Sequence, residues 1–183
     1  MSRNRWMLLL ATAPLLTGAV ACGVDGTTPG LEAKTLFLSV VPEGGSTGVD
    51  PAAPVEVRFD HAMMSGMEEY ALLHLGGLTG PAVAGTWSLS PDRIRLTFMS
   101  DASLQAGTRY TIHLGGGMVD EGGRPIDWEM RGFDMGGQWA TETMMGSGMG
   151  TGMGGVVGAG HMGSGWDHAN GSYGMVFTFT TAG

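Results

Sequence analysis

The 183-residue sequence contains a single cysteine and few charged side chains. One cysteine excludes an intrachain disulfide and any zinc site built from several thiolates. Lys and Arg number 9 against 17 Asp and Glu, which gives a formal net charge of −8. The chain therefore lacks the basic face that binding to nucleic acid requires. No segment keeps a helical hydrophobic period over three turns, so long amphipathic helices are not expected either.

The first 21 residues are expected to direct export and not to fold. Arg3 and Arg5 precede an apolar run over residues 6–21 that is too short to span a bilayer comfortably. The run ends in Ala-Val-Ala-Cys22-Gly, which resembles the cleavage site of a bacterial lipoprotein signal peptide. That resemblance implies that Cys22 becomes the lipid-modified first residue. The alternative is an ordinary secretory signal that leaves Cys22 as a spare thiol.

The resulting expectation is an exported protein, anchored to a membrane by lipid, on the periplasmic side or at the cell surface. Residues 22–33 read Cys-Gly-Val-Asp-Gly-Thr-Thr-Pro-Gly-Leu-Glu-Ala and are expected to form a flexible tether. The expected partners are the membrane, through the anchor, and an envelope protein.

What is abundant after the tether is strict alternation of apolar and polar residues. Val55–Phe59, Arg93–Phe98 and Arg109–Leu114 alternate without a fault, which is typical of strands with one buried face. Further strand candidates are residues 36–41, 70–75, 85–89 and 175–180. Turn residues separate these runs, so the pattern predicts an all-β antiparallel sandwich that occupies residues 34–183.

The same residues resemble the SbsA-type bacterial Ig-like domain. Val40-Val-Pro-Glu-Gly-Gly-Ser-Thr-Gly-Val-Asp-Pro51 resembles the opening of that family, and Leu104-Gln-Ala-Gly-Thr-Arg-Tyr-Thr-Ile112 resembles a later strand. Val119-Asp-Glu-Gly-Gly-Arg-Pro125 resembles its conserved turn, although Gly123 replaces the usual asparagine. The resemblance implies a single Ig-like β-sandwich that acts as a structural or binding module and shares no catalytic residues with relatives. The chain is accordingly expected not to be an enzyme.

An insertion over residues 128–174 interrupts the sandwich before its last strand. Its 47 residues include 15 glycines and 7 methionines but only 5 charged side chains. So many glycines make ordering costly in conformational entropy, which favours a low-complexity loop. Three interpretations remain open: an inert linker, an adhesive loop that binds a partner, and a soft-metal site.

The soft-metal interpretation predicts a copper site, because thioethers and imidazoles together suit Cu(I). The spacing of the methionines also resembles the methionine-rich motifs of bacterial copper proteins, and CopC-type copper-resistance proteins offer a looser resemblance. The candidate Cu(I) ligands are Met144, Met145, Met149, Met153, His161, Met162 and His168. His74 and His113 lie on predicted strands and are expected to be structural. The alternative function is therefore a periplasmic or surface copper-binding protein.

Overall fold

Seven strands form where the alternating segments and the further strand candidates predict them. They are β1 (Thr35–Val41), β2 (Val55–Phe59), β3 (Ala71–Leu75), β4 (Gly85–Leu89), β5 (Arg95–Ser100), β6 (Arg109–Leu114) and β9 (Met175–Thr180). The computed structural model describes residues 34–145, 161 and 163–183. The predicted targeting segment, the tether and Cys22 lie outside the described residues. None of the helices in the described part of the chain has the length and apolar character that crossing a bilayer requires.

Five short elements were not predicted by the pattern. Two are strands of two residues, β7 (Ile126–Asp127) and β8 (Gln138–Trp139). The others are single helical turns: η1 (Met67–Tyr70), α1 (Trp128–Arg131) and α2 (Glu142–Met145). None is long enough to show a hydrophobic period, so the sequence pattern does not predict them.

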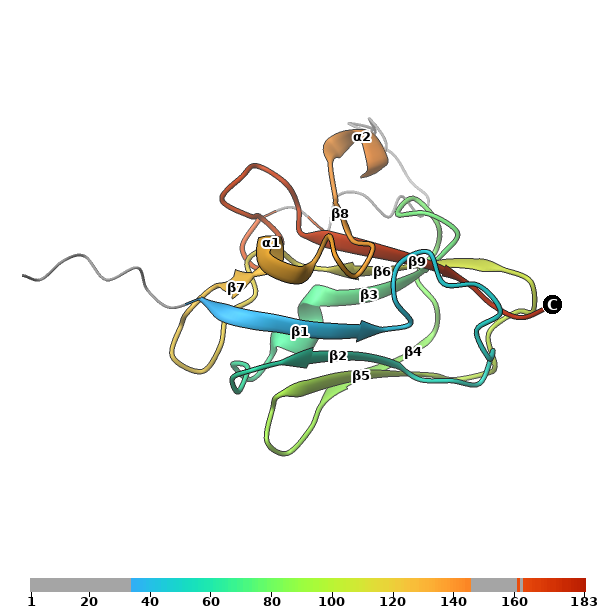
Figure 1. Ribbon diagram of the computed structural model, residues 1–183, viewed down its shortest axis with the longest axis horizontal. Helices are drawn as coiled ribbons and strands as arrows, with labels where there is room; N and C mark the ends of the chain where they lie inside the picture. Colours follow the sequence, from blue (N-terminus) through green and yellow to red (C-terminus); the bar gives the residue numbers. More distant parts are fainter. Residues whose placement is uncertain (1–33, 146–160, 162) are drawn as a thin grey trace, which may run out of the picture. The chain divides into compact units, whose positions relative to one another are not determined.

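The strands form two sheets that pack face to face (Figure 1). One sheet has the order β4-β5-β2-β1-β7, and the other has the order β3-β6-β9-β8. All pairs are antiparallel except β1 with β7. The predicted all-β, Ig-like sandwich is therefore confirmed.

The core lies between the inner faces of the sheets. Val57 and Phe59 of β2 point into it from one sheet, and Ile112 of β6 and Phe177 of β9 point into it from the other. Phe37 joins the two layers, with its ring 5.5 Å from that of Phe177. Burial of these alternating side chains supplies the main driving force for folding.

A buried carboxylate closes the turn that leads into β7. Asp120 accepts hydrogen bonds from Thr35 Oγ1 at 2.6 Å and from Arg124 Nε at 2.6 Å, and from the backbone N–H of Gly122 at 2.8 Å. Burial alone would raise the pKa of Asp120, but the bonds from Thr35 and Arg124 outweigh it and lower the pKa to about 2. Asp120 thus ties the start of β1 to the turn, which explains an aspartate in this motif.

The first part of the insertion belongs to the sandwich and not to a loop. Trp128 is fully buried, and its ring lies 5.5 Å from Phe37 and 6.4 Å from Phe59. Ala140 and Trp166 are buried as well. The expected loop boundary at residue 128 is therefore wrong: the strand pattern ends there, but the hydrophobic core does not.

Replacing Trp128 with alanine is expected to lower the free energy of unfolding by about 3–5 kcal/mol, because it empties a large site in the core. Met130 lies on the same helical turn but is 59% exposed, so Met130→Ala should change it by less than about 0.5 kcal/mol. Urea unfolding of both variants measures the difference. Two equally small effects would show that α1 does not contribute to the core.

Candidate metal site

His74 of β3 and His113 of β6 lie on the outer face of their sheet. Leu73 and Ile112 point into the sandwich core, so the alternation of the strands directs both histidines to the opposite side. In the antiparallel register His74 pairs with Thr111 and Leu72 pairs with His113, which makes the two histidines diagonal neighbours. Diagonal neighbours are within reach of one another when the side chains are long. Both histidines are 0% exposed.

The end of the insertion, a covering segment of residues 161 and 163–174, lies over the two histidines on this outer face. The backbone N–H groups of Gly116 and Gly117 donate to the carbonyl oxygens of Trp166 at 2.9 Å and of Gly165 at 3.2 Å. Gly165 has a positive φ of 88° and lies against the Tyr70 ring, where a β-carbon would come within 2.0 Å of ring atoms. Glycine at this position therefore allows the segment to approach the sheet closely.

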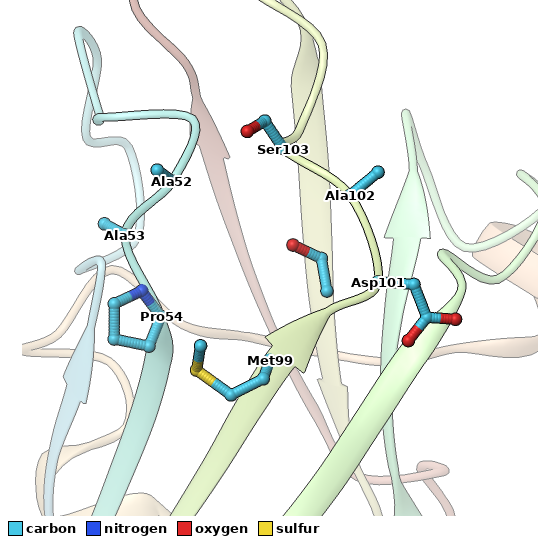
Figure 2. Close-up of a pocket in the computed structure, with 8 residues that line it drawn as sticks. Ala52, Ala53, Pro54, Met99, Asp101, Ala102 and Ser103 are labelled. Atoms are coloured by element: carbon cyan, nitrogen blue, oxygen red, sulfur yellow. The ribbon is translucent and has the colours of Figure 1, made fainter.

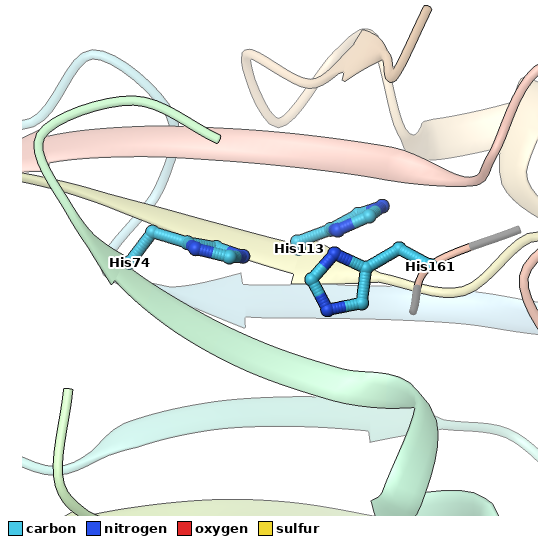
Figure 3. A group of neighbouring side chains, drawn as sticks. All are labelled: His74, His113 and His161. Atoms are coloured by element: carbon cyan, nitrogen blue, oxygen red, sulfur yellow. The ribbon is translucent and has the colours of Figure 1, made fainter. Parts of the chain in front are cut away.

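His161, from this covering segment, completes a cluster with the two strand histidines (Figure 3). One ring nitrogen of each histidine lies within 4.8 Å of the corresponding atoms of the other two. The ring centroid of His161 lies 5.6 Å from that of His74 and 5.5 Å from that of His113. His161 is 9% exposed, so all three imidazoles are largely removed from water.

Backbone carbonyls fix the tautomers of the two strand histidines. A carbonyl oxygen only accepts hydrogen bonds, so His74 donates through Nδ1 to Gly80 at 3.1 Å, and His113 donates through Nε2 to Tyr173 at 2.8 Å. The remaining nitrogens, His74 Nε2 and His113 Nδ1, are buried and have no hydrogen-bond partner among the described residues. Each therefore carries a free lone pair. This arrangement, with one nitrogen oriented by a carbonyl and the other free, is the one that metal-ligating histidines adopt.

Burial keeps the cluster uncharged. Desolvation lowers the pKa of His113 to about 3, despite the opposing hydrogen bond to Tyr173, and it also lowers the pKa of His74. The pKa of His161 is lowered by burial first and by the neighbouring His74 second. Neutral imidazole is the form that binds metal ions, so the cluster is in its ligand form at neutral pH.

Three converging neutral imidazoles can hold a transition-metal ion. Metal–nitrogen bonds of about 2.0–2.1 Å place ligand nitrogens roughly 3.3 Å apart in a tetrahedral site. The ligand nitrogens lie within 4.8 Å of one another, so the widest pair would have to close by up to about 1.5 Å on binding. The residues present therefore fit a three-histidine metal site.

The structure separates the two histidines that the sequence analysis grouped with methionines. His161 joins His74 and His113, whereas His168 stacks on Trp139 with ring centroids 4.7 Å apart. The Nε2 atom of His168 lies 3.7 Å from Glu129 Oε1. His168 thus has partners of its own outside the cluster.

The methionines of the predicted Cu(I) site are described only in part. Met144 lies on α2 and is 41% exposed, and the backbone of Met145 ends the same helix. Met149, Met153 and Met162 lie outside the described residues, so their part in a metal site stays a prediction.

The sequence pattern does not mark His74 and His113 as ligands. Both occupy the polar phase of an alternating strand, where a side chain normally faces water. The one sequence signal is that both histidines lie on the same face of their strands, opposite the core residues. What alternation does not reveal is that a distant glycine-rich segment covers this face.

Other features of the fold offer weaker sites. A hollow of about 190 Å³ is lined by residues 52–54 and 99–103, and Asp101 is its one ionisable side chain (Figure 2). Gly44-Gly-Ser46-Thr-Gly48 has the spacing of a serine-nucleophile motif, but it lies in the connection between β1 and β2 and not between a strand and a helix. Neither feature brings together the groups that catalysis requires.

The free energy of unfolding of the metal-free protein is expected to fall as the pH drops below about 6.5. The unfolded histidines take up protons near that pH, whereas the folded His74 and His113 have lowered pKa values and do not, so acid favours the unfolded state. Urea unfolding at pH values from 7 to 5 measures this dependence. The His74→Gln/His113→Gln variant should decline less steeply, and parallel curves would contradict burial of the histidines in neutral form.

The bacterial Ig-like domain family matches residues 32–131, which is more than half of the chain. No curated protein sequence matches significantly.

Several solved structures resemble the fold at low identity. The S-layer protein SbsC is 18% identical with a TM-score of 0.37, and the match covers 51% of this chain and 12% of that protein. PcoC, a methionine-rich copper resistance protein from Escherichia coli, is 14% identical with a TM-score of 0.43 over 81% of this chain and 99% of PcoC. L,D-transpeptidase 1 from Mycobacterium tuberculosis is 18% identical with a TM-score of 0.35, over 43% and 34% of the two chains. These likenesses carry no argument about function.

Proposed function

Because this chain belongs to the bacterial Ig-like domain family, we propose that it is a noncatalytic cell-envelope module whose binding function is to hold a transition-metal ion. The ligands are His74, His113 and His161. Ig-like modules carry no shared catalytic residues, so function depends on the sites that each chain adds to the fold. In this chain the added site is the histidine cluster beneath the insertion.

The observation that carries the proposal is the pair of free, buried nitrogens. His74 Nε2 and His113 Nδ1 are oriented by carbonyl bonds on the opposite side of each ring and have no partner among the described residues. Leaving buried polar atoms unpaired costs about 1–3 kcal/mol each. A bound metal ion uses both lone pairs and removes this cost.

Imidazole ligands suit zinc, copper, iron and nickel. The sequence favours copper, because the segment that leads to His161 carries Met144, Met145, Met149 and Met153, and Met162 follows it. Thioethers bind Cu(I) without losing a proton and do not form disulfides. We propose that these methionines supply additional soft ligands for copper.

The metal-binding proposal is tested by equilibrium dialysis of the metal-free chain against Zn(II) or, under reducing conditions, Cu(I), with the bound metal measured by mass spectrometry. The unaltered chain is expected to bind one ion, and this binding is expected to depend on the histidine cluster. His161→Ala should weaken binding by roughly 100-fold or more, since loss of a direct ligand exceeds the 10–100-fold effect of outer-shell partners.

His168→Ala is the matched control, because His168 is a neighbouring histidine that packs on Trp139 outside the cluster. It should bind as the unaltered chain does. Retention of the metal by His161→Ala at unchanged affinity would contradict the proposal.

We also propose that the module is held at a membrane through a lipid on Cys22. Several acyl chains, each worth about 0.8 kcal/mol per buried methylene, anchor a protein far more firmly than a single chain does. Cys22→Ser is therefore expected to move the protein from the membrane fraction of the producing bacterium to the soluble fraction. Thr28→Ser, in the same tether, should leave it in the membrane fraction. Cys22→Ser protein that stays with the membranes would contradict the anchor.

A further inference from the structure

We infer that the histidine cluster selects a monovalent ion with a filled d shell, Cu(I), over the divalent ions Zn(II) and Cu(II). The inference rests on the proposed metal-binding function and deepens it by naming the charge of the ion. It follows from three features of the site: the charge of its ligands, the medium around them and the ring that covers it.

The first feature is the absence of an anionic ligand. Within the described ranges, the group of potential ligands around the cluster consists of His74, His113 and His161, with no carboxylate or thiolate. The sequence from residue 146 to 160, which the structure does not describe, contains no Asp, Glu or Cys.

The two acids closest in sequence to His161 are engaged elsewhere. Asp167 is exposed and accepts a hydrogen bond from the backbone N–H of Gly163 at 2.9 Å. Glu142 is exposed and accepts a hydrogen bond from the Tyr173 hydroxyl at 3.2 Å. Neither belongs to the ligand group, so an ion in the cluster would keep its full charge.

The second feature is the apolar medium. The outer face of the sheet carries a small hydrophobic cluster of Leu78, Ala140 and Val176, with Tyr173 packed against it. Val176 pairs directly with His113 in the β6–β9 register. The desolvation cost of an ion rises with the square of its charge, so a divalent ion loses about four times as much hydration free energy here as a monovalent ion of similar size. Three neutral imidazoles do not neutralise the second charge.

The third feature is the indole of Trp166. Its ring centroid lies 4.7 Å from that of His113 and 4.6 Å from that of His161, and the side chain is 6% exposed. Cu(I) is stable with two or three ligands, whereas Zn(II) in proteins takes four, the fourth often a water molecule. An indole packed on two of the imidazoles restricts the room for that water. Its π face also attracts a cation within about 6 Å of the ring.

The experiment compares Ag(I), a monovalent ion of the same electronic type that does not change oxidation state, with Zn(II) on the full chain. Each ion is titrated against a competing chelator, and bound metal and tryptophan fluorescence are recorded. Ag(I) is expected to bind more tightly than Zn(II), by a factor on the order of 100 or more once the differing charge cost is counted. Cu(I) under reducing conditions should follow Ag(I).

Three variants separate the histidine cluster from the methionines and test the first and third features, the ligand charge and the indole. A chain with Met144, Met145, Met149, Met153 and Met162 all changed to Leu removes the thioethers and should keep the preference for Ag(I). His161→Glu adds a negative charge to the ligand set and should shift the preference towards Zn(II). Trp166→Leu keeps an apolar cover but removes the indole, so the ratio of Ag(I) to Zn(II) affinity should fall.

The outcomes distinguish this inference from the function on which it rests. Zn(II) binding that depends on His161 and is as tight as Ag(I) binding would overturn the charge preference while the metal-binding function stands. If Ag(I) binding is lost when the five methionines are replaced but is unchanged in His161→Ala, neither the metal binding nor the charge preference belongs to the histidine cluster. A preference unchanged in His161→Glu would show that ligand charge does not set the selectivity.

Discussion

The hydrogen bond from His113 Nε2 to the carbonyl oxygen of Tyr173 ties the end of the insertion to the β-sandwich. It runs 2.8 Å from the strand β6, at the centre of the sandwich, to the end of the insertion. On one side it fixes the tautomer of a buried imidazole, and on the other it holds the chain just before β9. Gly174, the next residue, has a φ of 100°, and a β-carbon there would lie 2.0 Å from the Leu114 carbonyl oxygen. Only glycine lets the insertion enter β9 so close to β6.

Both faces of β6 are buried, each by a different part of the chain. Ile112 and Leu114 meet the opposite sheet, whereas on the outer face His113 packs on Trp166 of the covering segment and Thr111 is buried beside the loop that follows β3. Thr111 satisfies its hydroxyl by donating to the Gly76 carbonyl oxygen. Burial of imidazoles with free lone pairs destabilises the metal-free fold, and a protein tolerates such a cost where a ligand offsets it. The proposed metal binding would offset this cost, which packing of the three rings alone does not.

The fold and the site differ in how far the sequence could predict them. The sequence pattern located all seven long strands: three by strict alternation, which a half-buried strand produces, and four as further candidates separated by turn residues. It missed β7 and β8, which have two residues each, and it placed Trp128 in a loop although its ring packs on Phe37. A single buried aromatic residue after the last alternating segment leaves no periodic signal.

The site depended on contacts between distant parts of the chain. His161 was selected from composition, but with methionine partners, whereas the structure places it beside His74 and His113. The three residues are up to 87 positions apart and belong to β3, β6 and the insertion. Sequence alone does not state which face of a sheet a glycine-rich segment covers, since glycine carries no side chain whose burial could be read. That choice is made by backbone hydrogen bonds such as those of Gly116 and Gly117.

The most direct test of this account is nitrogen NMR of the imidazole rings in the metal-free chain at neutral pH. The account predicts neutral rings with the proton on Nδ1 in His74 and on Nε2 in His113, and it predicts that one equivalent of metal ion shifts the opposite nitrogen of each ring. Charged imidazolium rings, or protons on the nitrogens that face the cluster, would contradict it.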